Sequence, residues 1–451
     1  MAPGDTARLY HRLTSARPGD EWLRLVDDPR LLQGFEVMHL PTFPAPCKVY
    51  PDGVPEVALP REWPDTPGRL DLAALARLLH LSAGVVRTSA RADGRFYHFR
   101  AAGSAGGRSP YEVYVAACGV PGLDDGVHWY DPVGHALRRV GPPPAGGVTT
   151  LVVTGIPWRT GWQYAERGFR HIYWDVGSVL AQTLALAWPA ARLWTTFPDT
   201  PVTRLVGADG VHEWPVALVS LGPGEPAVAP GGDAVAGEVD VRPPVEFPLV
   251  TQAQRAGDAD VLGDPWPPGP PPMPELEEVI LRRGSTRIMD PLPVSRELLE
   301  SALAWALDGT RVPHFVAVHA VEGVLPGLYR WPELIRPGEL REQLFHVCMD
   351  QALGRDAAFV VMSAVDLDRL DDRGYREAQL DAGIVEGRLH LAAFAAGAGA
   401  TGMTFYDSEL PALFGEPLAG LLFTCVGVPA YRNKRGGRPG APVPIGIMRS
   451  R

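Results

Sequence analysis

The chain has 451 residues, 46% of them hydrophobic and 21% charged, with a formal net charge of −10 and a pI near 5.7. This length and composition predict two or three domains with sizeable cores and exclude a disordered chain, while the acidic balance argues against a general binder of nucleic acids. We expect a cytoplasmic protein without a membrane partner, because no basic and apolar leader opens the chain, no apolar run approaches the roughly 20 residues that span a bilayer, and the cysteines lie far apart without metal-binding spacing.

Residues 1–62 are predicted to form an N-terminal arm. A short helix is expected over 21–33, and the proline-rich stretch 44–60 cannot be helical, because proline blocks helix formation and restrains its neighbours. His11 lies in a cluster of polar and aromatic residues and is expected to be a structural hydrogen-bonding residue. Such an arm wraps over a domain or joins one domain to the next.

Residues 63–222 are predicted to form a first α+β domain. Leucines at helical spacing predict a helix near 70–79, and residues 157–164 are expected to form a loop dense in aromatic and polar groups. A helix of about 20 residues from Phe169 is apolar almost all round, which predicts burial in a core or a subunit interface. His128 and His135 are expected at the surface. Apolar and β-branched runs predict strands over 111–117, 123–131, 148–154 and 214–221.

Proline, glycine and aspartate dominate residues 223–274, which predicts a stiff, extended linker. Residues 275–451 are predicted to form a second domain with the same order of elements. Its helices are expected over 298–307 and 375–396, and its strands over 315–319, 326–331, 358–363 and 421–428. His314 and His319 flank a strand without metal-ligand partners at helical spacing.

An internal repeat relates the two halves. Arg167-Gly168-Phe169-Arg170, Asp175 and Gly177 match Arg373-Gly374-Tyr375-Arg376, Asp381 and Gly383 at a constant offset of 206 residues. Two copies of one α+β unit joined by a long segment describe a fused dimer. We therefore predict an intrachain pseudo-dimer, with the two buried helices central to the interface between the copies.

A basic cluster opens the second half at a predicted helix end, with Arg282, Arg283, Ser285 and Arg287 within six residues. Arginine is planar, always charged and bidentate, so the cluster suits a phosphate or another anion. A solvated basic helix end is the alternative interpretation of the same residues. In the first half, the loop Ser104-Ala105-Gly106-Gly107 exposes backbone amides that can approach a flat ligand.

These motifs resemble those of the nitroreductase superfamily, and specifically its SagB/McbC-type branch of flavin-dependent azoline dehydrogenases. Residues 10–14 and 48–60 resemble that branch's N-terminal arm, and Arg283-Gly284-Ser285-Thr286-Arg287 resembles its Arg-x-Ser-x-Arg flavin motif. Ser104 to Gly107 resembles its serine-glycine loop. Gly397-Ala398-Gly399-Ala400-Thr401-Gly402-Met403 resembles the glycine-rich segment along the flavin, with Ala400, Thr401, Gly402 and Met403 as the expected contacts. Arg432-Asn433-Lys434-Arg435 resembles the basic residues that reach the phosphate, chiefly Lys434 and Arg435.

The resemblance implies FMN as the cofactor, bound at the interface between two α+β units. The second half has the arginine motif and the basic tail, whereas its counterpart of the serine-glycine loop is shortened to residues 308–313. The first half has the serine-glycine loop. It has no Arg-x-Ser-x-Arg motif between Leu59-Pro60 and the helix that follows. One composite site can be built in this way, so we predict one FMN per chain.

The resemblance also implies a catalytic stretch. Azoline dehydrogenases of this branch carry a Lys-Tyr pair in a segment like Trp-Lys-Tyr, and this chain has Trp162-Gln163-Tyr164. Tyr164 is the predicted base for the ring proton, but Gln163 cannot titrate, so it can position a carbonyl without supplying charge. A tyrosine with a pKa near 10 needs electrostatic help to act as a base, which Arg159 or Arg167 could supply.

Three functions follow as alternatives. The first is oxidation of peptide thiazolines or oxazolines to thiazoles or oxazoles in ribosomal peptide biosynthesis, with a cyclodehydratase as a possible partner enzyme and O2 reoxidising the flavin. The second is an NAD(P)H-dependent reductase of nitro compounds or quinones. The third is a degenerate scaffold that binds a peptide or a partner enzyme without turnover.

Overall fold

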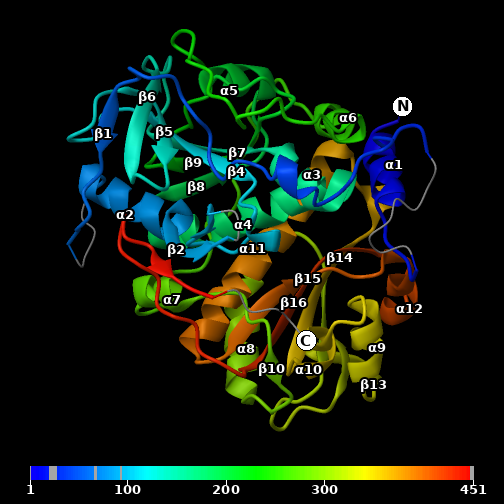
Figure 1. Ribbon diagram of the computed structural model, residues 1–451. Coiled ribbons are helices and arrows are strands. Elements are labelled where there is room, and N and C mark those ends of the chain that lie inside the picture. Colours follow the sequence, from blue (N-terminus) through cyan, green and yellow to red (C-terminus); the bar gives the residue numbers. More distant parts are fainter. Residues whose placement is uncertain (1, 20–27, 65–68, 92–93, 447–451) are drawn as a thin grey trace. The chain divides into compact units, whose positions relative to one another are not determined.

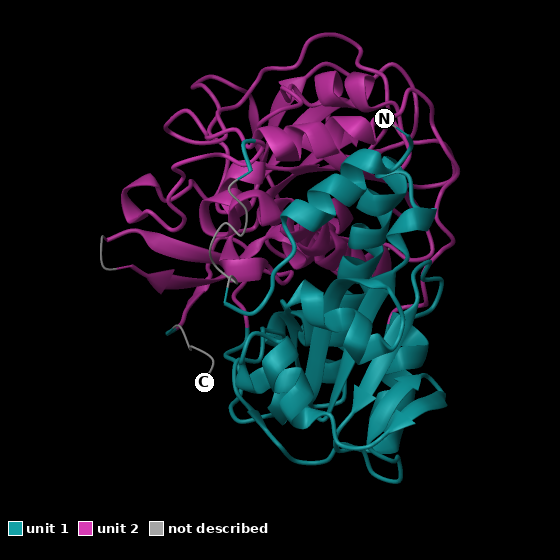
Figure 2. Ribbon diagram, turned by 90° about the vertical axis from the view of Figure 1, so that its right-hand side faces the viewer, with its two compact units in different colours: residues 1–29, 273–435, 446–451 teal, residues 30–272, 436–445 magenta. Residues whose placement is uncertain are grey.

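The computed structural model describes residues 2–19, 28–64, 69–91 and 94–446, and the chain divides into two compact units (Figures 1 and 2). Unit 1 comprises residues 1–29, 273–435 and 446–451, and unit 2 comprises residues 30–272 and 436–445. The N-terminal arm predicted over residues 1–62 is therefore shared between the units. The segment predicted to be a linker belongs wholly to unit 2 up to residue 272.

Unit 2 is built on a seven-stranded antiparallel sheet with the strand order β1-β6-β5-β4-β7-β9-β8. Its strands are β1 (Glu56–Ala58), β4 (Tyr111–Ala117), β5 (Gly126–Asp131), β6 (Ala136–Gly141), β7 (Thr150–Gly155), β8 (Ala191–Trp194) and β9 (Trp214–Leu221). The helices are α2 (Leu72–Ala83), α3 (Pro157–Tyr164), α4 (Gly168–Leu186), α5 (Asp199–Leu205) and α6 (Pro248–Ala256). Strands β2 (Val85–Ala90), β3 (Phe96–Arg100) and β17 (Val443–Pro444) form a second sheet in the order β17-β2-β3.

Unit 1 contains several helices and one seven-stranded sheet. The strand order is β10-β16-β14-β11-β12-β13, and β15 also pairs with β16. The strands are β10 (Met289–Asp290), β11 (His314–Val318), β12 (Gly327–Arg330), β13 (Glu333–Pro337), β14 (Phe359–Val365), β15 (Gly399–Met403) and β16 (Ala419–Pro429). The helices are α1 (Asp5–Leu13), α7 (Leu276–Arg282), α8 (Arg296–Ala306), α9 (Arg341–Val347), α10 (Ala352–Asp356), α11 (Asp372–Ala395) and α12 (Leu410–Phe414).

The two units have the same core topology. Strands β6-β5-β4-β7-β9-β8 of unit 2 and β13-β12-β11-β14-β16-β15 of unit 1 follow one another in the same order, with antiparallel pairing throughout. A long buried helix follows the fourth strand of each series, α4 in unit 2 and α11 in unit 1. The internal repeat predicted from the sequence is therefore present as a repeated architecture.

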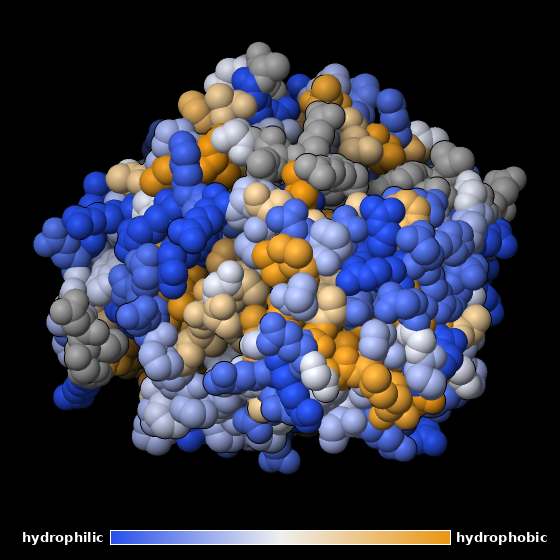
Figure 3. Space-filling model, turned by 90° about the horizontal axis from the view of Figure 1, so that it is seen from below, coloured by the Kyte–Doolittle hydropathy of each residue, from blue (hydrophilic) through white to orange (hydrophobic). Residues whose placement is uncertain are grey.

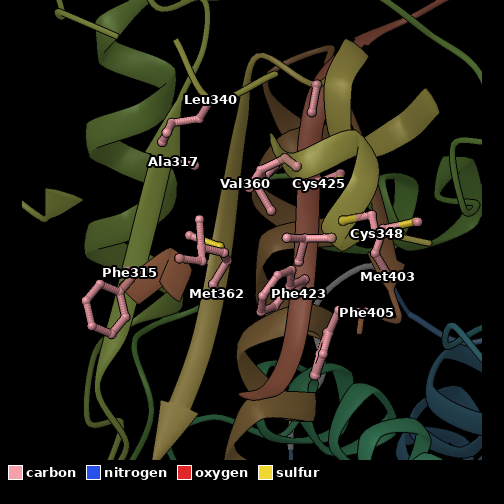
Figure 4. Close-up of a cluster of buried hydrophobic side chains, with 14 of the residues drawn as sticks. Phe315, Ala317, Leu340, Cys348, Val360, Met362, Met403, Phe405, Phe423 and Cys425 are labelled. Carbon is pink, nitrogen blue, oxygen red and sulfur yellow. The ribbon is translucent and has the colours of Figure 1, made fainter. Parts of the chain in front are cut away.

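The core of unit 1 shows why its strands are apolar on both faces. Side chains alternate across a strand, so neighbouring residues enter different layers. Phe315 and Ala317 of β11 lie in one cluster, together with Val360 and Met362 of β14, as Figure 4 shows. Val316 and Val318, which alternate with Phe315 and Ala317 along β11, pack in a second cluster with residues of α8 and α11.

One carboxylate on each buried helix holds an equivalent loop. In unit 2, Asp175 of α4 accepts hydrogen bonds from the Ser104 hydroxyl at 2.5 Å and from the Ala105 N–H at 3.0 Å. In unit 1, Asp381 of α11 accepts from the N–H groups of Arg311 and Val312 at 2.6 and 3.1 Å, both through Oδ2. The two aspartates matched by the sequence offset thus perform the same structural task.

Several sequence-based expectations were wrong. Residues 157–164 form helix α3 rather than a loop, with Pro157 at the first helical turn, where its missing N–H costs nothing. The segment 223–274 contains helix α6, and its residues up to 272 belong to unit 2. Residues 28–33, the described end of the helix predicted over 21–33, form turns and bends, and the rest of that prediction includes residues 20–27, outside the described part of the chain.

His128 and His135 are buried rather than exposed, with 1% and 2% of their surface accessible. The Nδ1 of His135 is 3.1 Å from the Tyr130 hydroxyl, and its Nε2 is 3.0 Å from the Pro60 carbonyl oxygen. Burial lowers the pKa of His135 to about 4. Hydrogen bonding by His11 agrees with the sequence-based expectation, since its Nδ1 lies 3.1 Å from the Tyr375 hydroxyl.

The surface carries scattered apolar side chains. In unit 1, Leu292, Leu325 and Ile335 are exposed, and the face in Figure 3 shows short apolar patches interrupted by polar and charged residues. Singly exposed apolar residues are common on folded proteins and need no partner. In the part of the chain that the structure describes, no helix combines the length and apolar character needed to cross a membrane.

Asp381 generates a pH-dependent prediction. Burial raises the pKa of this carboxyl to about 6, against the opposing effect of the two N–H groups. Because the folded-state pKa lies above the ordinary value of 3.8, the contribution of this group to stability is complete below that value and is lost as the pH rises through about 6. In Asp381→Asn, whose side-chain oxygen can accept the same two hydrogen bonds, this loss disappears.

We therefore expect the free energy of unfolding of Asp381→Asn, relative to the parent, to increase by about 1–3 kcal/mol between pH 4 and pH 7. Urea unfolding at a series of pH values measures this difference. The exposed Asp290→Asn serves as the control and should show little such change. A difference for Asp381→Asn that does not vary with pH would contradict the assignment.

Candidate functional site

The arginine–serine segment of unit 1 runs beside the glycine-rich strand β15. Helix α7 ends at Arg282, where Arg283 turns the chain to an extended conformation with ψ of 144°. Ser285 then forms a parallel bridge to Ala400, and the Thr286 N–H donates to the Ala400 carbonyl oxygen at 2.9 Å. Two segments that the sequence predicted for one site, over 100 residues apart in the chain, are thus neighbours.

The C-terminal basic segment reaches the same place. The Tyr431 hydroxyl accepts a hydrogen bond from the Arg287 N–H at 3.0 Å and donates to the Ser285 carbonyl oxygen at 3.4 Å. Gly284 leaves room for the Asn433 amide, since a Cβ at position 284 would lie 2.8 Å from its nitrogen. Lys434 and Arg435 follow directly, so the predicted basic tail lies against the predicted arginine motif.

The cations of this cluster differ in their surroundings. Glu278 contacts two of them, with its carboxylate oxygens 3.5 Å from Arg282 Nε and 2.8 Å from Arg435 Nε. Arg283 is buried, with 4% of its surface accessible. Arg287 is exposed, and no ion pair to it occurs among the described residues. Arg287 is therefore the side chain of the motif best placed to bind an external anion.

One orphaned polar atom supports a ligand site here. The Thr286 hydroxyl is buried and lacks a hydrogen-bond partner within the described residues. It lies against Gly399, where a Cβ would come 2.2 Å from the hydroxyl oxygen, so only glycine fits at that position. With Ser285 and the surrounding cations, the segment provides hydroxyl and guanidinium donors, which are the groups that bind phosphate.

The other predicted residues of the glycine-rich segment have mostly structural surroundings. Ala400 and Thr401 are buried in the sheet, and Met403 packs in the core cluster of Figure 4. Gly402 is closest to the Glu386 carboxylate, at 3.2 Å from where its Cβ would stand. The backbone of this strand, rather than its side chains, is what borders the arginine motif.

The predicted serine-glycine loop and the predicted catalytic stretch meet in unit 2. Asp175 accepts a hydrogen bond from the Ser104 hydroxyl of this loop, and the Ser109 N–H donates to the same hydroxyl at 2.7 Å. Gly106 has a φ of 58°, and a Cβ there would lie 2.4 Å from the Gln163 side-chain oxygen. Gln163 therefore packs directly on the glycine backbone of the loop, next to Tyr164.

Tyr164 lies against a residue that sequence analysis did not single out, His171. Their rings stack with centroids 4.1 Å apart and planes inclined by 8°. His171 Nδ1 is 3.1 Å from the Arg167 carbonyl oxygen, so Nδ1 carries the proton. Burial, followed by the nearby Arg167, lowers the pKa of His171 to about 3 and keeps the ring neutral. The second half has Glu377 at the position that corresponds to His171 at the offset of 206 residues. This difference between the repeats was the signal in the sequence that could have pointed to His171.

Arg159 has a structural position instead of the catalytic one predicted for it. Its guanidinium is buried and donates to the carbonyl oxygens of Ala45, Ser109 and Tyr111 at 3.0–3.2 Å, and to the Glu112 carboxylate at 2.5 Å. Each nitrogen of the guanidinium thus has a partner inside the fold. These contacts hold the arm and β4 together, and they use the guanidinium nitrogens of Arg159 inside the fold.

Arg108 is a cation near Tyr164 that the sequence did not single out as a candidate. It follows the serine-glycine loop, its Nε donates to the Gly106 carbonyl oxygen at 2.9 Å, and Tyr164 contributes to the electrostatics of its guanidinium. The signal in the sequence was its place directly after the two glycines. Arg167 is near His171, whose pKa it helps to lower.

The arginine motif also has a second occurrence in the chain, Arg87-Thr88-Ser89-Ala90-Arg91. These residues lie mostly in strand β2, between β17 and β3, with Arg87 and Ser89 buried. Neither of those neighbours is a glycine-rich strand, so the surroundings of Ser285 are not reproduced there. The pattern alone does not distinguish the two segments, whereas the structure does.

A cavity of about 380 Å³ lies elsewhere in unit 2, between Lys48, Glu213 and residues 236–244. The Lys48 ammonium and the Glu213 carboxylate in its wall are paired at 2.5 Å. None of the predicted site residues lines this cavity. Across the described residues, no group of three or more histidine, cysteine or acidic side chains could hold a metal ion.

No protein-family model matches the chain. It is 28% identical over 181 residues to a protein of Methanocaldococcus jannaschii assigned as a nitroreductase, an alignment that covers 36% of this chain and 84% of that protein. The crystal structure of a protein from Anabaena variabilis, also assigned as a nitroreductase, matches with a TM-score of 0.76 and 24% identity, covering 94% of this chain and 99% of that one.

The packing of Gln163 on Gly106 can be tested by substitution. Gly106→Ala should destabilise the protein through the positive φ and the displaced Gln163 side chain, whereas Gly119→Ala, with a φ of 68° and open space around it, should carry the cost of the backbone alone, about 1–2 kcal/mol. Urea unfolding of both variants measures the difference.

In a Gln163→Ala background, the extra cost of Gly106→Ala should disappear, giving a coupling energy of about 0.5–3 kcal/mol. Additive effects of the two substitutions would show that the Gln163 side chain does not pack on the loop.

Proposed function

From the α+β nitroreductase-like fold of this chain, we propose that the protein is an FMN-dependent oxidoreductase. The observation that carries the proposal is the pairing of the arginine–serine segment with strand β15 in unit 1, where the basic tail also arrives. Arg283, Ser285 and Arg287 would hold the FMN phosphate, with Lys434 beside them. Arg282 and Arg435, which contact Glu278, complete the positive field around the site.

We further propose that the reaction is the oxidation of thiazolines or oxazolines in a peptide to thiazoles or oxazoles. Bound FMN would supply a two-electron acceptor. Tyr164 would take the proton that leaves the ring carbon, and Gln163 would position a substrate carbonyl through its amide. The neutral His171 ring, stacked on Tyr164, limits the orientations of the phenol and so preorganises the base.

The dehydrogenase proposal is supported by the resemblance of Trp162-Gln163-Tyr164 to the catalytic stretch of SagB-type enzymes. The alternative, an NAD(P)H-dependent reductase of nitro compounds or quinones, is supported by the names of the relatives, which are assigned as nitroreductases. The two proposals share the flavin and differ in the direction of electron flow. Loss of a catalytic tyrosine should matter for the first and little for the second.

The remaining sequence-based expectations stay predictions. These are a peptide substrate, a cyclodehydratase as a partner enzyme, a cytoplasmic location, and one flavin that uses residues from both halves. One FMN per chain is expected on simpler grounds as well, because the arginine–serine segment beside a glycine-rich strand is found in unit 1 and the second occurrence of the motif lies in a different setting.

Two substitutions separate binding from catalysis. Arg287→Gln should weaken FMN binding roughly 10- to 100-fold, since a charge-assisted hydrogen bond is worth about 1.5–3 kcal/mol. Tyr164→Phe should keep FMN bound and abolish azole formation from a thiazoline-containing peptide. Flavin fluorescence titration measures the first effect, and mass spectrometry of the peptide, which detects the loss of two hydrogens, measures the second.

Arg296→Gln is the matched control for the binding measurement, because Arg296 is an exposed cation of unit 1 paired with Glu300 at 2.8 Å. Full FMN affinity in Arg287→Gln would show that the phosphate lies elsewhere. Normal azole formation by Tyr164→Phe would remove this tyrosine from the mechanism, and reduction of nitro compounds by NADPH without any azoline oxidation would favour the reductase.

A further inference from the structure

Arg108 is enclosed by aromatic rings in unit 2. The centre of its guanidinium lies 4.5 Å from the ring centroid of Phe43, 5.2 Å from that of Trp162 and 5.5 Å from that of Tyr97. Guanidinium groups stack favourably on aromatic faces, and these contacts fix the orientation of the side chain. The flat fork of donors is therefore held rigidly, which favours binding of a planar anion such as a carboxylate.

The charge of Arg108 is not neutralised by a carboxylate within the described part of the chain, since no ion pair to it is found there. Its one described backbone hydrogen bond uses Nε, which leaves the terminal nitrogens for the Tyr97 hydroxyl and for a ligand. Burial lowers the pKa of this guanidinium, whereas Tyr164 and Tyr97 act in the opposite direction. A half-buried cation in this setting would gain from an external anion.

The position of Arg108 links it to the proposed catalytic residues. Its Nε donates to the Gly106 carbonyl oxygen, and the Gln163 side chain packs on the same glycine. The ring of Trp162, which immediately precedes Gln163, contacts the guanidinium. A ligand that pairs with Arg108 would therefore lie next to the stretch that carries Tyr164.

Strand β3 provides a second binding feature beside this cation. It is an edge of the three-stranded sheet, and no described strand pairs with its outer side. Tyr97 and Phe99 lie on one face of β3; Tyr97 contacts Phe43, and Phe99 lies 3.2 Å from where a Cβ of Gly107 would stand. An unpaired edge binds an extended peptide through main-chain hydrogen bonds, and its flanking side chains select the sequence.

We propose that an acidic, extended segment of the peptide substrate adds to the outer edge of β3 and pairs one of its carboxylates with Arg108. The inference rests on the proposed function, because it names the substrate feature that brings a peptide to Tyr164. The charge of Arg108, which forms no ion pair within the described residues, thus favours acidic over basic segments.

Binding of short fluorescent peptides to the full-length protein tests this inference without requiring turnover. The probe is a fluorescein-labelled decapeptide of alternating Glu and Val. Two comparison peptides are used, one with Lys in place of Glu and one with N-methylated backbone amides. Fluorescence anisotropy should show binding of the Glu peptide, at least 10-fold weaker binding of the Lys peptide, and loss of binding on N-methylation, because the methyl groups block main-chain hydrogen bonds.

Arg108→Gln should weaken binding of the Glu peptide at least 10-fold, and Arg108→Lys should weaken it less because the charge is kept. Arg204→Gln, which removes an exposed cation from the same unit, should leave the affinity unchanged. Unfolding curves identify a variant that fails to fold, in which case the comparison of the Glu and Lys peptides on the parent protein decides the outcome.

Equal binding of the Glu and Lys peptides, or unchanged affinity in folded Arg108→Gln, would overturn the inference. The FMN content of the same samples separates it from the proposed function. A protein with FMN that fails to prefer the Glu peptide contradicts only the inference. A protein that cannot take up FMN but prefers the Glu peptide through Arg108 contradicts only the proposed function.

Discussion

The carboxylate of Asp175 is the contact on which the candidate catalytic region of unit 2 depends. It lies on the buried helix α4 and holds both Ser104 and Ala105. Because those two residues are fixed, Gly106 can take its positive φ and receive the Gln163 side chain. A buried carboxylate that accepts hydrogen bonds is costly to leave without them, so the loop and the helix are bound to each other.

The same constraint appears in unit 1, where Asp381 holds the N–H groups of Arg311 and Val312. There the loop is short and carries no serine, and the arginine–serine segment lies beside β15. The two units thus share one strand order and differ in the loop that their buried aspartate holds. Under the proposed function, each unit would supply a different part of one flavin site.

Much of this could be predicted from the sequence. Hydrophobic periodicity, a local signal, identified the long buried helices and most of the central strands, and the repeat at an offset of 206 residues indicated two similar units. The resemblance to a known family, rather than periodicity, placed the segments of Ser285 and Ala400 in one site. The sequence could not show that Arg159 donates its hydrogen bonds to backbone carbonyl oxygens, since these belong to distant segments. It also could not show that His171 stacks on Tyr164, since this contact depends on how the chain turns between α3 and α4. Proline and glycine in 223–274 indicated an irregular chain, but not that it folds with unit 2. The arginine motif occurs twice, and only packing distinguishes the two.

The arginine–serine segment of unit 1 is proposed to bind one FMN. The most direct test is the amount of flavin released by denaturation from protein reconstituted with excess FMN and freed of unbound cofactor, measured against protein concentration from amino-acid analysis. We expect one equivalent of FMN per chain. Two equivalents would show that the second arginine motif, or another segment, also binds flavin, and a protein that retains none would contradict the proposed flavin site.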